Sequence, residues 1–275
     1  MAFDDFEPPY DRYAIAYRDW WGPVIAPSAV RLLDSVGVPA GDPRRFELLD
    51  VGTGTGALAL AALARWPGTQ VTGVDPSGRM LDLAAEGADR LGDGARGRLR
   101  LLQGSFDRMP VANESMDVAI SSFVIQLVPS RAAGLREIGR VLRPGGRFAC
   151  ITWQAESNPF EPDDAFLTAL DELEIDVPPI DHDARPYTSP EAAAAELRRE
   201  GFGRVQGRIE WLEHRYTPES FLAVLEHWIE SDLFEELEPE MRERLHFLTL
   251  DKLRRLPADT FVWRRPLISV AGDLR

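Results

Sequence analysis

The segment ELLDVGTGTGALALAALARW, residues 47–66, has the pattern of a strand, a glycine turn and a helix. The short, mostly apolar run 47–51 predicts a buried strand. Glycine alternates with threonine from Gly52 to Gly56, and the Ala- and Leu-rich run that follows, without a breaker until Pro67, predicts a helix. Glycines let the backbone approach a ligand, and the first amide groups of a helix point toward it. The segment therefore indicates a nucleotide-binding arrangement.

Two cofactor classes are compatible with this turn. Gly52, Gly54 and Ala57 satisfy the dinucleotide pattern GxGxxG/A, and Asp75 follows at about the distance of the acid that binds a ribose. The acid at Asp50 is unfavourable beside a pyrophosphate but suits a ligand that carries an ammonium and a sulfonium group. The turn alone leaves both classes open, together with a turn that serves only the fold.

Composition and charge narrow the class of protein. The chain has 275 residues, 44% of them hydrophobic, and a net charge of −14. Such a field opposes a nucleic-acid partner, and the short arginine clusters, such as the one at 96–100, are interpreted as solvated faces. No apolar run is long enough for a membrane span, the N-terminal residues do not resemble a signal peptide, and the single cysteine, Cys150, excludes an internal disulfide. We expect a cytoplasmic protein with no membrane or nucleic-acid partner.

Strand and helix patterns alternate along the chain. Besides 47–51, strands are expected at 70–75, 98–103, 116–123, 147–153, 203–213 and 261–270. Helices are expected between the early strands, at 78–91 and 130–142. This alternation predicts an α/β fold with a Rossmann-like, doubly wound, mostly parallel seven-stranded sheet, which binds ligands beyond the carboxyl ends of its strands.

Three segments are expected within one domain. Residues 1–45 carry helices at 10–17 and 27–36 and form a helical lid; residues 46–153 form the cofactor-binding core. Residues 154–275 supply a substrate-side insert and the last strands, with helices expected at 163–174, 189–201, from 217 and at 236–256.

Four segments in this order carry a family resemblance: ELLDVGTGTG, VTGVDPSGRML, LLQGSFDRMPVANESMDVAISSFVIQLVP and LREIGRVLRPGGRFACITW. From residue 46 to about residue 153 the chain resembles the class I S-adenosylmethionine-dependent methyltransferases, in the small-molecule group that includes the ubiquinone and menaquinone C-methyltransferases. RVLRPGG before a strand is typical of that group, and dehydrogenases do not require it.

The resemblance implies S-adenosylmethionine as cofactor and S-adenosylhomocysteine as product. It places the turn 52–56 beneath the methionyl group, Asp75 on the ribose hydroxyls, Pro76 and Met80 against adenine, and the backbone near Ser122 and Phe123 at the methionyl amine. The cofactor-binding set that it implies is Asp50, Gly52, Thr53, Gly54, Gly56, Asp75, Pro76, Met80, Ser105, Phe106 and Ser122. Met80 is equally compatible with a place in the core.

Two positions depart from the family pattern. Ser105, followed by Phe106, stands where relatives place an aspartate that accepts from the adenine amino group, so this role is weaker or shared with Asp107. Gln126 stands where many relatives carry a histidine that faces the substrate, and an amide cannot act as a general base.

Methyl transfer from a sulfonium chiefly needs alignment and exclusion of water, so a base is optional. The catalytic residue stays unknown, with His214, His182 and Gln126 as weak candidates; Asp181, His227 and His246 are further possibilities. A surface or packing role is the more probable reading of each histidine. No spacing of histidines and cysteines indicates a metal site.

Aromatic residues are dense in the expected lid and insert, which suits a large apolar acceptor, although part of them can belong to the core. The expected lid and substrate residues are Tyr10, Tyr13, Tyr17, Trp20, Trp21, Phe123, Trp153 and Trp211. Trp228 is a further aromatic residue of the expected insert. A polyketide, terpenoid, quinone or similar secondary metabolite fits such a pocket.

The leading hypothesis is therefore an S-adenosylmethionine-dependent methyltransferase, monomeric or homodimeric, that acts on a small hydrophobic molecule. The alternative is a protein of this fold that no longer methylates and uses the site for cyclisation, isomerisation or binding. A third hypothesis, an NAD-dependent dehydrogenase, lacks a Tyr–Lys pair, since Lys252 is the only lysine.

Overall fold

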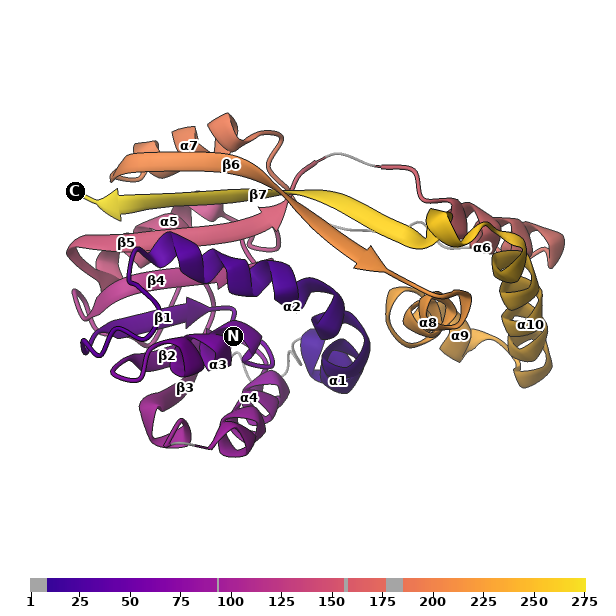
Figure 1. Cartoon of the computed structure of the whole chain (residues 1–275), viewed down its shortest axis with the longest axis horizontal. Helices are drawn as coiled ribbons and strands as arrows, with labels where there is room; N and C mark the ends of the chain where they lie inside the picture. The colour runs from indigo at the N-terminus through magenta and orange to yellow at the C-terminus, as the bar shows by residue number, and fades with distance from the viewer. Residues whose placement is uncertain (1–8, 93, 156–157, 177–184) are drawn as a thin grey trace, which may run out of the picture.

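The computed structural model describes residues 9–92, 94–155, 158–176 and 185–275. Its centre is a seven-stranded sheet with the order β3-β2-β1-β4-β5-β7-β6 (Figure 1). The first five strands are parallel, and β7 runs antiparallel to β5 and β6. The strands are β1 (Glu47–Val51), β2 (Gln70–Asp75), β3 (Leu99–Gln103), β4 (Met116–Ser122), β5 (Leu142–Trp153), β6 (Phe202–Arg215) and β7 (Val262–Leu274). The predicted α/β class and the mostly parallel seven-stranded sheet are confirmed.

Helices cover both faces of the sheet and create two cores. Leu48 packs with α2 (Gly22–Arg31) and α3 (Ala57–Arg65), and Leu49 packs with α5 (Arg131–Val141) and α7 (Pro190–Arg199) on the other side. The two leucines separate in this way because successive side chains of a strand point to opposite faces. Both are fully buried, as expected for an inner strand of a parallel sheet.

One of the connections between the first five strands contains no helix. α3 joins β1 to β2, α4 (Gly78–Leu91) and a 3-10 turn at Arg96–Arg98 join β2 to β3, and α5 joins β4 to β5. The segment 104–115, which joins β3 to β4, contains no helix and is fully within the described residues. The sheet face beside β3 is therefore less covered than the rest.

The N-terminal segment is helical, as predicted, but its second helix begins earlier. It consists of α1 (Pro9–Ala16), a π-helical turn at Tyr17–Trp21, α2 and a 3-10 turn at Leu32–Val36. The prediction that the second helix starts at Pro27 is wrong, because Pro23 occupies the first turn of α2 and Pro27 lies within the helix. Proline is well tolerated in a first turn, so two prolines near one helix made its start ambiguous.

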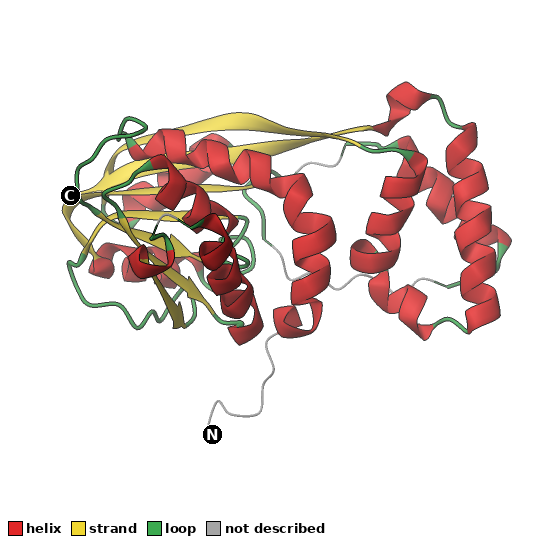
Figure 2. Ribbon diagram, turned by 60° about the horizontal axis from the view of Figure 1, so that its bottom comes forward, coloured by secondary structure: helices red, strands yellow, loops and turns green. Residues whose placement is uncertain are grey.

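The helices of the insert form a small group beyond the ends of β6 and β7 (Figures 1 and 2). They are α6 (Glu161–Glu172), α8 (Pro218–Val224), a π-helical turn at Leu225–Ile229, α9 (Ser231–Glu236), α10 (Pro239–Arg255) and a 3-10 turn at Ala258–Phe261. The helices expected at 163–174 and 236–256 are present as α6 and α10, with bounds shifted by a few residues. Of the helices within the described ranges, none has the length and hydropathy that a membrane span requires.

Two glycines of α5 provide a matched test of the packing beneath this helix. A Cβ at Gly134 would lie 2.1 Å from Cδ1 of Phe106, whereas a Cβ at Gly139 would lie 3.5 Å from Cδ1 of Leu274. Gly139→Ala should raise the free energy of unfolding by about 0.5–1 kcal/mol, because alanine is the better helix former. Gly134→Ala should lower it by about 1–3 kcal/mol, because Phe106 must move. Urea denaturation measures both, and equal effects would contradict this packing.

Candidate functional site

The strand order reverses between β1 and β4, and the glycine turn lies at the carboxyl end of β1, where such sheets bind ligands. Gly52, Gly54 and Gly56 have φ angles of +71°, +53° and +85°, which favour glycine. A Cβ at Gly52 would lie 2.2 Å from Cγ2 of Val124, whereas a Cβ at Gly54 would meet nothing within 4 Å. The turn is therefore tightly packed at Gly52 and open at Gly54.

Asp50 lies beneath this turn with 1% of its surface exposed. Thr53 Oγ1 donates a 2.8 Å hydrogen bond to its Oδ2, but its Oδ1 has no hydrogen-bond partner in the described part of the chain. Burial raises the pKa of Asp50 to about 7, and the nearby carboxylate of Asp75 acts in the same direction. An unpartnered buried acceptor is unfavourable, so a cationic donor at this position would stabilise the carboxylate.

Asp75, at the carboxyl end of β2, connects the turn to the start of α4. Its Oδ2 accepts from the amide of Gly54 at 2.8 Å, and its Oδ1 accepts from the amide of Ser77 at 2.9 Å. Burial raises its pKa, while these two amides oppose the shift. Each carboxylate oxygen can accept a further hydrogen bond, so Asp75 can still receive two hydroxyl groups.

The N-terminal helix α1 is held against the start of α4. Asp11 accepts hydrogen bonds from Ser77 Oγ and, at 3.2 Å, from the amide of Arg79. Ala14 packs with Met80 and Leu83, so Met80 lies between α1 and α4. The expected lid therefore contacts the element that carries the expected adenine residues.

Five aromatic side chains from distant segments form a continuous row, called the aromatic row below: Tyr17, Trp228, Trp21, Trp153 and Trp263. The ring centroids of Trp228 lie 5.4 Å from Tyr17 and 6.3 Å from Trp21. Trp21 in turn lies 6.3 Å from Trp153 and 5.8 Å from Trp263. The row joins the N-terminal segment, the insert and the ends of β5 and β7.

The row begins within electrostatic reach of the two buried acids. The pKa of the Tyr17 phenol is raised mainly by burial and further by Tyr10, Asp75 and Asp50. Tyr10 and Tyr13 also lie near the first indole of the row, with centroids 6.5 and 6.4 Å from that of Trp228. The predicted lid tyrosines therefore meet at one tryptophan of the insert.

The side-chain amide of Gln126 holds the backbone at the end of β4. Phe123 has a φ of +57°, and its ring centroid lies 4.7 Å from that of Trp153. Gln126 Nε2 donates to the carbonyl of Phe123 at 2.6 Å, and its Oε1 accepts from Thr152 Oγ1. Gln126 thus positions the backbone after Ser122, which is half-buried, and both ends of its amide are occupied.

The residues expected at adenine lie in different surroundings, some at the surface and some buried. Ser105 is exposed, and its Oγ donates to Asp107 Oδ1 at 2.7 Å. Pro76 is exposed at the same end of the sheet. Phe106 instead points into the second core, against the helix α5 at Gly134. Its ring is therefore placed for packing rather than for contact with a ligand.

The histidines do not converge. His214 lies at the far side of the row, 4.4 Å from the Tyr216 ring, and burial lowers its pKa, which favours the neutral form. His227 stacks on Trp20 at 4.7 Å, and Nδ1 of His246 lies 2.6 Å from Glu226 Oε1. Asp181 and His182 lie outside the described residues. Among the residues that are described, no three metal-ligating side chains form a group.

Trp211 is not part of this arrangement. Trp211 pairs with Pro266, and His214 pairs with Trp263. Trp211 lies three residues before His214, an odd number, so its side chain points to the face of the β6–β7 ribbon opposite to that of His214 and Trp263. There it is 48% exposed beneath the guanidinium of Arg264. Three contributors escaped the sequence reasoning: Asp11, Thr152 and Trp263. Only Trp263 had a signal, since it lies within the strand expected at 261–270, two residues after aromatic Phe261.

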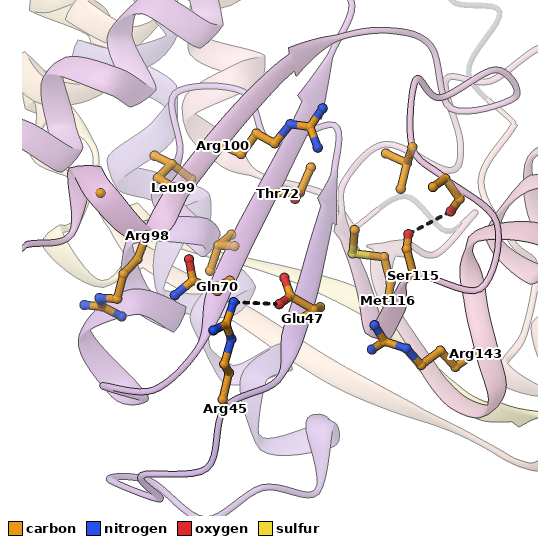
Figure 3. A pocket seen from close by; sticks show the side chains of 14 residues that line it. Arg45, Glu47, Gln70, Thr72, Arg98, Leu99, Arg100, Ser115, Met116 and Arg143 are labelled. Carbon is orange, nitrogen blue, oxygen red and sulfur yellow. Dashed lines mark hydrogen bonds and ion pairs between the residues drawn. The ribbon is translucent and has the colours of Figure 1, made fainter.

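The sheet also has a hollow of about 370 Å³ at its opposite edge, near Arg100 (Figure 3). It lies at the amino ends of β1, β2 and β3, far along the strands from the glycine turn. We place the candidate functional site at the carboxyl ends, because the turn, the buried acids and the aromatic row meet there.

Known proteins resemble this chain in sequence. A family model described as "Methyltransferase domain" matches residues 49–150. The chain is 41% identical over 112 residues to a ubiquinone/menaquinone biosynthesis C-methyltransferase of Syntrophotalea carbinolica, covering 41% of this chain and 46% of that protein. It is 33% identical over 177 residues to the protein of that name from Paracoccus denitrificans, covering 58% of this chain and 68% of that protein. The chain spans about half the length of the first curated relatives that it matches.

Solved structures share the fold at low sequence identity. The YcgJ protein of Bacillus subtilis has a TM-score of 0.57 and 20% identity, covering 90% of this chain and 98% of that one. A geranyl diphosphate C-methyltransferase of Streptomyces coelicolor, in complex with S-adenosyl-L-homocysteine, has a TM-score of 0.52 and 19% identity, covering 99% and 86%. At this identity the likeness shows the fold alone.

The raised pKa of Asp50 predicts a pH dependence of the ligand-free chain. The folded chain keeps this proton up to about pH 7, whereas the unfolded chain releases it near its ordinary value of 3.8. The contribution of Asp50 to the free energy of unfolding should therefore fall as the pH rises from about 4 to 7, by up to about 1.4 kcal/mol per pH unit. Asp50→Asn cannot ionise and should lack this decline.

Urea denaturation between pH 5.5 and 7.5 measures the effect. Asp82→Asn, which removes an exposed carboxylate of α4, is the matched control and should follow the unaltered protein. Parallel curves for Asp50→Asn and the unaltered protein would contradict the assignment.

Proposed function

Because the chain belongs to the class I S-adenosylmethionine-dependent methyltransferases, we propose that it transfers a methyl group to a small, largely hydrophobic acceptor. The observation that carries the proposal is the position of the aromatic row, which starts within electrostatic reach of Asp50 and Asp75 and extends away from the glycine turn. A polyketide, terpenoid, quinone or similar secondary metabolite is the acceptor class that such walls favour.

The residues at the turn fit S-adenosylmethionine. The unpartnered Oδ1 of Asp50 would receive the methionyl ammonium, which also stabilises the ionised carboxylate. Asp75 would receive the ribose hydroxyls, and the open side of Gly54 leaves room for close approach of the backbone. A dinucleotide fits less well, because a pyrophosphate would be repelled by the buried carboxylates.

The bound cofactor supplies an activated methyl group on a sulfonium, so the chain need not create a leaving group. The chain's own contribution is alignment and exclusion of water, which account for much of the acceleration in such displacements. Asp11 and the packing of Ala14 on Leu83 hold α1 over the turn. On its other side, the hydroxyl of Tyr13 donates to Asp232 of α9 at 2.7 Å, which joins this helix to the insert.

None of the candidate catalytic residues that the structure describes places a proton acceptor near the turn. Gln126 uses both its amide nitrogen and its amide oxygen in hydrogen bonds within the chain, and His214 stands at the far side of the row. This favours acceptors that react as a carbanion or as an easily ionised phenol or enol, for which a strong base is not needed.

Calorimetric titration with S-adenosylmethionine, S-adenosylhomocysteine and NAD tests the cofactor. Both adenosyl compounds should bind and NAD should not. Asp75→Ala should weaken binding by more than about 100-fold, because each of two charge-assisted hydrogen bonds contributes roughly 1.5–3 kcal/mol. Asp82→Ala is the matched control, since it removes an exposed carboxylate of the neighbouring helix. Binding of NAD alone would refute the proposal.

Trp263→Ala tests the acceptor side. Loss of this indole opens the aromatic row, so the KM for the best acceptor from a panel of naphthoquinols, phenolic polyketides and terpenoid alcohols should rise at least about tenfold. The affinity for S-adenosylhomocysteine should not change. Trp211→Ala, on the opposite face of the same ribbon, should alter neither value. An equal rise in KM for both variants would contradict the position proposed for the acceptor.

A further inference from the structure

The hollow at the amino edge of the sheet exists because the β3–β4 connection has no helix. Arg100 of β3 pairs directly with Thr72 of β2, and Gln70 pairs with Glu47 of β1, so these side chains share the hollow (Figure 3). In a doubly wound sheet a crossover helix would normally cover such a face. Here the connecting segment covers it only in part, and Arg100 remains exposed.

The hollow is positively charged within an acidic protein. Four arginines line it, Arg45, Arg98, Arg100 and Arg143, against one lining carboxylate, Glu47. Arg45 lies 3.7 Å from Glu47, and Arg143 is paired at 2.5 Å with Asp117, just outside the hollow. Counting both acids still leaves an excess of two positive charges.

Two of the guanidinium groups carry charge without a carboxylate partner. Arg98 donates to the carbonyls of Leu63, Trp66 and Thr69, which hold its guanidinium at the C-terminal end of α3, pointing away from Arg100 (Figure 3). The side chain of Arg100 makes no hydrogen bond or ion pair with any residue that the structure describes. Its five N–H groups are free, and the hydroxyl of Thr72 is its direct cross-strand neighbour.

From this arrangement we infer that the hollow binds a small organic phosphate, with Arg100 as its main ligand. A guanidinium matches two phosphate oxygens at once, and the excess of positive charge around the hollow strengthens the attraction. Gln70 and Thr72 add neutral donors, and a hollow of about 370 Å³ accommodates a phosphorylated sugar or a nucleotide. This site is separate from the one proposed for methyl transfer.

Titration calorimetry at low salt tests the inference, with S-adenosylhomocysteine at saturation so that the adenosine site is filled. The probes are pyrophosphate, ribose 5-phosphate and AMP, with citrate as a polyanion without phosphate. At least one phosphate should bind more tightly than citrate, and Arg100→Gln should weaken its binding at least tenfold. The three phosphate probes distinguish a site for the phosphate alone from one that also recognises a sugar or a base.

Arg244→Gln is the matched control. It removes one exposed arginine of α10, which makes no ion pair or hydrogen bond with described residues, and it should leave binding unchanged. Equal weakening in both variants would mean that only the general field attracts the anion and would overturn the inference. Absence of phosphate binding by the unaltered protein, or tighter binding of citrate, would overturn it as well. Thermal unfolding of both variants verifies that they are folded.

Discussion

The burial of two carboxylates, Asp50 and Asp75, beside one glycine turn is the constraint on which the site depends. A buried charge must be hydrogen-bonded, paired or neutralised by a shifted pKa. Asp75 meets this requirement through two backbone amides, whereas Asp50 is stabilised by the hydroxyl of Thr53 and, more weakly, by the amide of Ala59, and has a pKa of about 7. The turn must therefore keep its left-handed glycines to deliver the amide of Gly54 to Asp75.

The N-terminal segment joins the helix that follows Asp75 to the insert. α1 is attached to α4 through Asp11 and to α9 through Tyr13, and its aromatic side chains gather around Trp228. In a site of low dielectric constant, a cation bound to Asp50 interacts more strongly than it would in water. Recognition of the cofactor and closure against solvent thus depend on the same contacts, which also form the first part of the aromatic row.

Local patterns predicted most of the fold and the cofactor side of the site. The strand, the turn and the acids at Asp50 and Asp75 follow from neighbouring residues, and the order of the motifs gave the sheet. The remaining features depend on distant contacts. Asp11 meets Ser77 across 66 positions, and the register of β6 on β7 turns Trp211 away from the row while it brings Trp263 in. Phe106 packs under α5 because Gly134 leaves space there, which no local pattern reveals.

The distribution of charge also depends on contacts between residues that are distant in the sequence. The arginines at 96–100 look like a solvated face in the sequence, but the fold adds Arg45 and Arg143 to them and leaves the surface beside β3 uncovered. Acids therefore lie at the carboxyl ends of the strands and arginines at the amino ends. β1 has five residues, which at about 3.3 Å each separates the two edges by roughly 16 Å. At that separation a ligand at one edge would not contact a ligand at the other.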